Sequence, residues 1–335
     1  MVPYFIILIF QLTLSAKKNS KILFYISFIV LFIFMGFRGY EVGTDVKQYQ
    51  NDFDIYKTSG MVFAVEPLWY LLNRFVIFLG GGFREVLLLS SFLVLLPVYF
   101  CSKRWSSFPF FSIFFYIGLY FFCNSFNAIR QAISISIGLL GILYYEKNEN
   151  IKNTRAISLL IVSFLFHYSS IVLPLGFFFS KILKNNSRYL LFFVLASFFI
   201  GSFLADFLLV LATRITNYNI GLLNIWGNMA VALSLNLLFL FISNIIKVKD
   251  QHFYIFTTFI IFSNLLMRIP FGYRMVMGLG LIQILLLPNL IGNNRLDKSS
   301  RKLMVLLFVL YALFTFTLYL SINFSNVIPY NNILF

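Results

Sequence analysis

Long apolar segments follow one another along almost the whole chain, separated by short polar stretches. They cover about residues 1–16, 22–37, 67–83, 86–102, 108–123, 126–145, 156–180, 189–212, 229–246, 253–267, 274–291 and 303–322. None alternates apolar and polar residues with a period of two, so helices are predicted in place of the strands of a barrel. The sequence shows no internal repeat and no low-complexity segment.

The composition shows which solvent these helices face. Hydrophobic residues make up 60% of the chain, charged residues 11%, and the mean hydropathy is +0.89. Soluble domains are about a quarter charged, so lipid is the expected surroundings. The 335 residues leave room for about ten to twelve crossings of roughly 20 residues each. We therefore predict an all-α, polytopic membrane bundle of 10–12 transmembrane or re-entrant helices, forming a single domain over 1–335.

The net charge of +15 comes from Lys and Arg in short loops, which favours orientation in the bilayer over nucleic-acid binding. The basic residues next to the apolar segment 1–15 lie after it and not before it. A cleaved signal peptide has its basic residues before the apolar segment, so residues 1–15 are expected to form the first helix. The basic stretches 17–21, 247–249 and 295–302 are assigned to the cytoplasm. The loop 38–66 and both chain ends are then outside.

The topology of the middle of the chain stays open. If 67–83 and 156–180 both span the membrane, the basic stretches 102–106 and 147–155 face outward, against the positive-inside rule. If both are re-entrant or interfacial, every strongly basic loop is cytoplasmic. Polar residues and prolines within both segments favour the re-entrant alternative.

The loop 38–66 holds five of the eleven acidic residues: Glu41, Asp45, Asp52, Asp54 and Glu66. Gly43-Thr44-Asp45 is typical of a helix start, and Asp45 with Gln48 fits the spacing of a capping box. The predicted short helix ends at Ser59-Gly60 and carries on one face Asp45, Tyr49, Asp52 or Phe53, and Tyr56. It is either a surface helix with a structural cap or a polar face presented to a substrate.

Six arginines occur singly near the ends of apolar runs: Arg38, Arg74, Arg130, Arg214, Arg268 and Arg274. A guanidinium keeps its charge and donates two parallel hydrogen bonds, which suits a diphosphate. Anchoring at the membrane surface by snorkelling is the competing explanation. Arg268 and Arg274 also flank Pro270 and Gly272, which predict a broken helix that lines a cavity.

Two further motifs carry polar groups within apolar segments. Asn127, Arg130 and Gln131 share one helix face, for binding or for contact between helices. His167, within Phe166-His167-Tyr168-Ser169, is either a general base or a buried histidine satisfied by a serine. Cys101 and Cys123 lack metal-ligand spacing, and no metal, nucleotide or phosphate-loop motif is present, so no metal and no cofactor is expected.

Four of these motifs, in this order over roughly 35–175, resemble the EpsG-like family of exopolysaccharide polymerases, related in role to Wzy O-antigen polymerases. They are Arg38-Gly-x-x-Val-Gly-Thr-Asp45 with Tyr49 and Phe53, then Glu66-Pro67 with Leu72-Asn73, then Asn127-x-x-Arg130-Gln131, and Phe166-His167-Tyr168-Ser169. The resemblance implies a bacterial inner-membrane enzyme whose site faces outside. It would transfer a growing glycan from undecaprenyl diphosphate to a second lipid-linked repeat unit.

Roles for individual residues follow as expectations. Arg130, Arg268 and Arg274 would bind the diphosphate, and His167 or Asp45, with Glu66 as third choice, would activate the acceptor hydroxyl. Further substrate contacts are expected from Arg38, Thr44, Tyr49, Asn73, Asn127, Gln131 and Ser169. The expected partners are membrane lipid, the lipid-linked oligosaccharide and polysaccharide, and a chain-length regulator and flippase of the same pathway.

Three alternatives remain open from the sequence. A flippase for lipid-linked oligosaccharide would also place arginines in a cavity, although such proteins commonly contain internal repeats. A glycosyltransferase that uses a polyprenyl-phosphate sugar would account for the acidic outer loop. A membrane acyltransferase built around His167 is the third.

Overall fold

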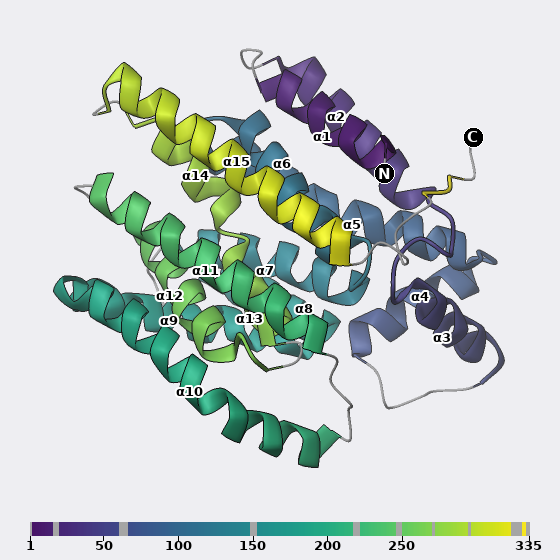
Figure 1. Cartoon of the computed structure of the whole chain (residues 1–335). Coiled ribbons are helices and arrows are strands. Elements are labelled where there is room, and N and C mark those ends of the chain that lie inside the picture. Colours follow the sequence, from purple (N-terminus) through teal and green to yellow (C-terminus); the bar gives the residue numbers. More distant parts are fainter. Residues whose placement is uncertain are drawn as a thin grey trace. The chain divides into compact units, whose positions relative to one another are not determined.

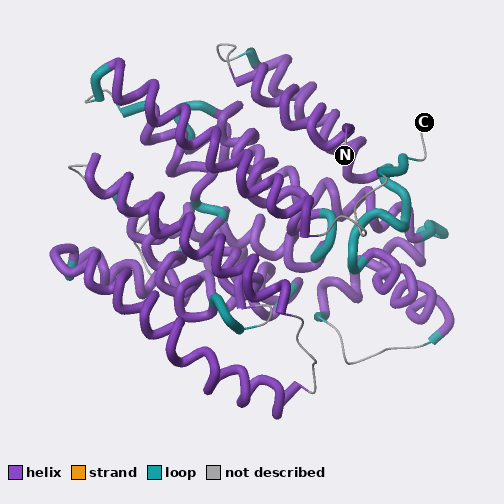
Figure 2. The backbone as a smooth tube through the Cα atoms, viewed as in Figure 1, coloured by secondary structure: helices purple, strands orange, loops and turns teal. Residues whose placement is uncertain are grey.

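The computed structural model is helical throughout the residues it describes, which are 2–15, 20–59, 66–147, 153–216, 222–245, 250–269, 272–293, 296–322 and 330–332. Over 204–216 and 222–228, and at 322, only the backbone is described. Figure 2 shows the described segments as helices joined by short loops. Among them, extended pairing occurs only as one isolated antiparallel bridge, between Arg38 and Asn332. The prediction of an all-α fold is confirmed.

The helices follow the predicted apolar runs in order (Figure 1). They are α1 (Val2–Ser15), α2 (Lys21–Gly36), α3 (Val46–Thr58), α4 (Pro67–Phe78), α5 (Phe83–Trp105), α6 (Pro109–Tyr116), the π-helix η1 (Ile117–Ser125), α7 (Ile129–Lys147), α8 (Thr154–Phe166), the 3-10 helix η2 (Tyr168–Ile171), α9 (Val172–Asn185), the 3-10 helix η3 (Ser187–Tyr189), α10 (Leu190–Thr216), α11 (Leu222–Ile245), α12 (Gln251–Leu266), α13 (Gly272–Gly280), α14 (Gln283–Ile291) and α15 (Lys298–Ile322).

Several helices are suited to a membrane by length and composition. Among the described residues, α5 and α15 are long and apolar enough to cross one, and up to four spans result if the bent pairs α9–α10 and α13–α14 each count as one. Shorter apolar helices, such as α1, α2 and α8, accompany them. These features are those of a helical membrane protein, and the number of ten to twelve crossings stays a prediction.

Some predicted runs are divided in the structure. The run 156–180 separates into α8 and α9, with His167 at the break, and 274–291 is divided between α13 and α14. The run 67–83 yields α4 with only 12 residues, less than the roughly 20 that a span needs. The run 108–123 changes from α-helix to π-helix at Ile117. Averaged hydropathy gives no break in these runs, although polar residues such as His167, Ser169 and Ser170 interrupt 156–180.

The chain divides into two compact units: residues 1–170 with 284–335, and residues 171–283. The first contains α1 to α8, all of α14 except Gln283, and α15. In the second, α12 is buried along most of its length and contacts α9, α10, α11 and α13. Asn264 on α12 donates to Ser197 Oγ at 3.0 Å and exchanges hydrogen bonds with Asn236. Gly201 allows the close approach of α10, since a Cβ there would lie 1.9 Å from the Asn264 carbonyl oxygen.

In the first unit, α7 and α8 form the closest helix pair, and small residues explain how. Ser134 and Gly141 lie two turns apart on α7, and Ala156 and Ser163 lie two turns apart on α8. A Cβ at Gly141 would lie 3.1 Å from Leu160 and 3.3 Å from the Ala156 carbonyl oxygen. Ser134 Oγ donates to the Ser163 carbonyl at 2.7 Å, and Ser163 Oγ donates back to the Ser134 carbonyl at 2.8 Å. Small and hydroxyl side chains thus hold the two backbones together.

The C-terminal residues 330–332 dock on the segment that follows α2. Gly39 N donates to the Asn331 carbonyl at 2.8 Å. The Tyr330 hydroxyl donates to the Phe34 carbonyl at 2.8 Å, and the Tyr330 ring stacks on the Phe34 ring with centroids 4.2 Å apart. Asn332 Nδ2 donates to the Tyr330 hydroxyl at 2.9 Å. These contacts fasten the start of the predicted outer loop to the first unit.

Replacing Tyr330 tests this fastening. Tyr330→Ala removes the stacked ring and the hydroxyl contacts and is expected to lower stability by about 2 kcal/mol. Tyr330→Phe keeps the ring and should cost about 1 kcal/mol, the net value of the lost hydrogen bonds. Thermal unfolding of the purified protein in detergent, followed by intrinsic fluorescence, measures both. Equal unfolding temperatures for the wild type and Tyr330→Ala would show that the C-terminal segment does not brace the loop.

Candidate functional site

Glu66 is positioned by the proline that follows it. Pro67 is the first residue of α4, and a proline ring disfavours helical geometry in the preceding residue. Glu66 accordingly has φ −53° and ψ 126° and occupies the N-cap position. Its side chain is 11% exposed and lies at a helix N-terminus, where a negative charge is stabilised. The carboxylate is thus held at the end of α4, neither inside the helix nor free in solvent.

Arg130 pairs with this carboxylate from the first turn of α7. Its Nη1 lies 2.6 Å from Glu66 Oε2, and its Cζ lies 5.2 Å from the centroid of the Tyr49 ring. Tyr49 belongs to α3, so Arg130 joins α3, α4 and α7. An arginine at the end of an apolar helix needs such partners, because an unpaired charge in apolar surroundings is costly.

His167 reaches the other oxygen of the same carboxylate. It follows the last residue of α8 with extended backbone, φ −162° and ψ 120°, which turns its side chain away from the helix. Nδ1 lies 2.8 Å from Glu66 Oε1, and since a carboxylate only accepts, Nδ1 carries the proton and donates. Nε2 has no hydrogen bond to any described residue, and the side chain is 28% exposed. In the neutral form of the ring, Nε2 is therefore the nitrogen that can accept a proton.

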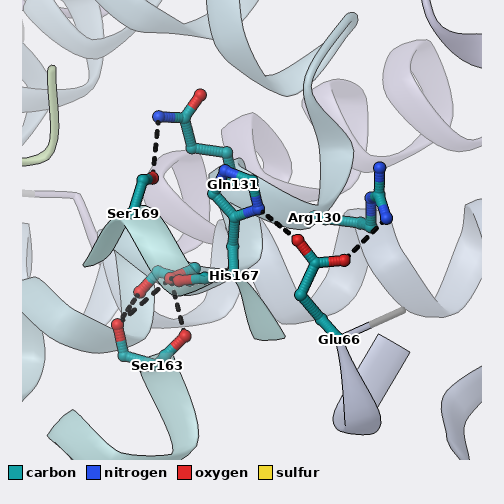
Figure 3. A network of polar contacts seen from close by, with 7 residues as sticks. Glu66, Arg130, Gln131, Ser163, His167 and Ser169 are labelled. Atoms are coloured by element: carbon teal, nitrogen blue, oxygen red, sulfur yellow. Dashed lines mark hydrogen bonds and ion pairs between the residues drawn. The ribbon is translucent and has the colours of Figure 1, made fainter. Parts of the chain in front are cut away.

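The close pairing of α7 and α8 fixes the two partners of Glu66. Ser134 lies one turn beyond Arg130 on α7, and Ser163 lies one turn before His167 on α8. Their hydrogen bonds, together with the one that the His167 amide donates to the Ser163 carbonyl at 3.2 Å, hold the two chain segments in register. Figure 3 shows the imidazole and the guanidinium reaching the two oxygens of Glu66. Pro67 and the Ser134–Ser163 pair thus bring the Glu66 carboxylate and its two partners together from three separate segments.

The electrostatic surroundings keep Glu66 ionised. Burial raises the pKa of the Glu66 carboxyl, but the hydrogen bond from His167 and the charge of Arg130 together outweigh burial, so its pKa lies below its ordinary value. An ionised carboxylate on Nδ1–H fixes the tautomer of the ring and stabilises the imidazolium that forms when Nε2 takes up a proton. This arrangement can serve as a general base.

Other predicted site residues surround this centre. Gln131 Nε2 donates to Ser169 Oγ at 3.4 Å, beside His167 (Figure 3). Asn127 Oδ1 accepts from the backbone amide of Thr44 at 2.8 Å, while its Nδ2 donates to the Tyr319 hydroxyl on α15. Asn127 therefore joins the segment before α3 to α15. Because Asn127 lies one turn before Arg130, it also connects that segment to the group formed by Glu66, Arg130 and His167, here called the Glu66 centre.

Gly43 makes the contact between the loop and Asn127 possible. Its φ is +117°, and a Cβ there would lie 2.3 Å from the Phe126 carbonyl oxygen. Only glycine tolerates both the positive φ and the close approach. Thr44 is exposed, and the contact described above uses its backbone amide.

The helix predicted within 38–66 is present as α3, which begins at Val46 and ends at Thr58 with Ser59 as its C-cap. Asp45 is the N-cap residue, as expected. The predicted capping by its side chain is wrong, because φ −102° and ψ −2° are nearly helical and the side chain makes no cap hydrogen bond. The predicted end at Ser59 is confirmed, and Gly60 lies outside the described residues.

Arg38 and Asn73 are buried within the first unit. Arg38 is 0% exposed, donates to the carbonyls of Met35, Val42 and Phe126, and lies 4.6 Å from the Phe126 ring centroid. Asn73 donates to the Trp69 carbonyl at 2.7 Å. In this structure both side chains hold backbone in place, and their contact with substrate stays a prediction.

Arg268 and Arg274 belong to the second unit and are half-buried. The predicted helix break between them is confirmed, since α12 ends at Leu266 and α13 begins at Gly272. A Cβ at Gly272 would lie 2.4 Å from the Leu266 carbonyl oxygen, which explains the glycine. Pro270 lies outside the described residues, and Arg214 lies where only the backbone is described. The role of Arg268 and Arg274 in diphosphate binding stays a prediction.

Two aspects of the site escaped sequence reasoning. The pairing of Glu66 with both Arg130 and His167 was not predicted, although all three were candidates. The aromatic support from Trp69, whose ring lies 5.2 Å from that of Tyr49, was also missed; its only signal is a tryptophan three residues after Glu66. The described residues contain no group of three or more His, Cys, Asp or Glu side chains placed to hold a metal ion.

The lowered pKa of Glu66 predicts acid sensitivity. A carboxyl with a lower pKa in the folded state contributes stability that is fully present above its ordinary value of 4.5 and is lost as the pH falls through the folded value. Glu66→Gln should therefore unfold at a lower temperature than wild type at neutral pH, with the difference shrinking below pH about 4.5. Thermal unfolding in detergent between pH 7 and pH 3 measures this, with Asp54→Asn, an exposed carboxylate on α3, as the control. An undiminished difference at low pH would contradict the assigned pairing.

Comparison with known proteins places the chain in a family. The model of the EpsG family matches residues 21–332, nearly the whole chain. No curated protein and no solved structure matches it. The match includes every described segment that contributes to the Glu66 centre. On this coverage the chain belongs to the EpsG family, an exopolysaccharide polymerase-like family.

Proposed function

We propose that this protein is a polysaccharide polymerase that joins lipid-linked repeat units at the outer face of a bacterial cytoplasmic membrane. Membership of the EpsG family supports a polymerase role in polysaccharide synthesis. The observation that carries the chemical part of the proposal is the contact of Glu66 with both Arg130 and His167. A carboxylate-oriented imidazole with a free Nε2 is suited to activating a hydroxyl.

The reaction is a glycosyl transfer between two lipid-linked glycans. An acceptor sugar hydroxyl on one repeat unit attacks the anomeric carbon of the growing chain, which is held on undecaprenyl diphosphate. The new glycosidic bond forms as the bond from that carbon to the diphosphate oxygen breaks. The electron pair leaves with undecaprenyl diphosphate, and the proton of the hydroxyl moves to His167 Nε2. Glu66 stabilises the resulting imidazolium.

We assign Arg130 a different role from the diphosphate binding that the sequence led us to expect. Its guanidinium is already paired with Glu66 at 2.6 Å, so it keeps that carboxylate ionised and in place. Diphosphate binding stays the proposed role of Arg268 and Arg274, which flank the break between α12 and α13 within the second unit. Guanidinium groups beside a broken helix can stabilise charge that develops on the leaving group.

The membrane arrangement of the proposal follows from the loop charges. The chain would form ten to twelve transmembrane or re-entrant segments, with α4 and α8 too short to span and the segment around α3 outside. The Glu66 centre then faces the exterior, where lipid-linked repeat units are joined. Membrane lipid, a flippase that delivers the units and a chain-length regulator are the proposed partners.

Replacing the proposed base gives the direct test. His167→Ala should lower the polymerisation rate at least about 100-fold, the usual contribution of a general base, so that cells accumulate single lipid-linked repeat units in place of long chains. Glu66→Gln should act in the same direction, because it loses the group that orients the ring. Gel analysis of polymer length, in cells that lack the native gene, measures both at matched expression.

His252→Ala is the matched control, since His252 is the other histidine of the chain and belongs to α12; it should leave long polymer. Long polymer from His167→Ala would remove His167 as the base. The side of the membrane on which single units accumulate separates the main alternative: units stranded inside indicate a flippase, and units outside indicate a polymerase.

A further inference from the structure

One face of α3 borders the Glu66 centre and remains unused by the mechanism above. Tyr49, Asp52 and Tyr56 lie on it at helical spacing of three and four residues. Arg130 lies over the Tyr49 ring at 5.2 Å, and the Tyr49 ring contacts that of Trp69 on α4. Asp52 is half-buried, while Tyr49 and Tyr56 are buried. The exposed edge of this face is therefore the Asp52 carboxylate, beside Arg130.

Polar atoms behind this edge lack partners. The Tyr56 hydroxyl and Arg130 Nε are buried and make no hydrogen bond to any described residue, although Tyr56 is only 2% exposed. A buried polar group without a partner costs about 1–3 kcal/mol, so such groups are rare unless something else satisfies them. A ligand rich in hydroxyl groups would supply the missing hydrogen bonds.

The charge of the cluster limits which ligand fits. Arg130 and Glu66 neutralise each other, and Asp52 adds a second carboxylate. Burial raises the pKa of the Asp52 carboxyl, the charge of Arg130 partly opposes the rise, and Glu66 adds to it. The three side chains together carry a net negative charge, and the nearby Arg74 guanidinium is engaged by the Tyr56 carbonyl, to which its Nη1 donates at 2.9 Å. An anionic group placed there would be repelled.

We infer that the face of α3 with Asp52 and Tyr56 is the acceptor-sugar subsite, and that it selects a sugar without an acidic group. The Asp52 carboxylate accepts hydrogen bonds from sugar hydroxyls, and the Tyr56 hydroxyl and Arg130 supply further partners. The inference rests on the proposed function, because it takes the sugar to be the acceptor that His167 activates. It adds a substrate class and a specificity-determining residue to that site.

A matched pair of probes tests the selection. Methyl glucoside and methyl glucuronide differ only at C6, where the glucuronide carries a carboxylate. Two like charges about 6 Å apart, at an effective dielectric constant of about 40, repel enough to weaken binding about tenfold. Saturation-transfer NMR titration of the full-length protein in lipid nanodiscs should therefore give an apparent Kd about tenfold higher for the glucuronide.

Three variants separate the contributions. Asp52→Asn should reduce the tenfold ratio to about two- to threefold, whereas Asp54→Asn, an exposed acid two residues away, should leave it unchanged. Tyr56→Phe should not lower the unfolding temperature, because the hydroxyl makes no hydrogen bond to any described residue, and should weaken glucoside binding about fivefold. Equal binding of the two probes to wild type, no binding of either probe, or equal effects of Asp52→Asn and Asp54→Asn would each overturn the inference.

The result can be distinguished from failure of the proposed function. If the two probes bind selectively but His167→Ala still makes long polymer, the sugar subsite stands and the catalytic assignment falls. If His167→Ala abolishes polymer but the probes bind alike, the polymerase stands and the Asp52 subsite is wrong.

Discussion

A single carboxylate joined to two partners organises the first unit. Glu66 accepts from Arg130 on one oxygen and from His167 on the other, and the three residues come from α4, α7 and the end of α8. Removing any one of them would leave a largely buried polar or charged group without its partner, which costs more than the pair contributes. The same constraint that holds the helices together therefore also orients the imidazole. Stability and chemistry depend on one interaction.

The rest of the first unit supplies the rigid frame that this interaction requires. Small residues at two-turn spacing bring α7 and α8 close enough for reciprocal serine hydrogen bonds. Gly43 lets the segment before α3 approach the Phe126 carbonyl, and Asn127 then accepts from the Thr44 amide. Arg38 anchors the start of that loop from inside. Because backbone carbonyls use its guanidinium, the polar loop is fixed without presenting its arginine to solvent.

The sequence predicts the helices and the identity of the central residues better than their partnerships. The apolar runs predict most helix positions, and motif order singles out Glu66, Arg130 and His167. A sequence does not show, however, that Arg130 forms an ion pair with Glu66, since that pairing depends on how distant segments pack. Asp45 illustrates the limit at short range: its residue type favours capping, but its backbone is nearly helical and its side chain does not cap. Hydropathy likewise cannot locate the break at His167.

The protonation of His167 is the most direct test of this account. With only two histidines in the chain, imidazole labelling with nitrogen-15 gives two ring systems, and His252→Ala assigns them. In lipid nanodiscs, the neutral ring of His167 should carry its proton on Nδ1, and Glu66→Gln should disturb that preference. A neutral ring that carries its proton on Nε2 in the wild type, or a tautomer preference that does not respond to Glu66→Gln, would contradict the claim that Glu66 orients His167 as a base.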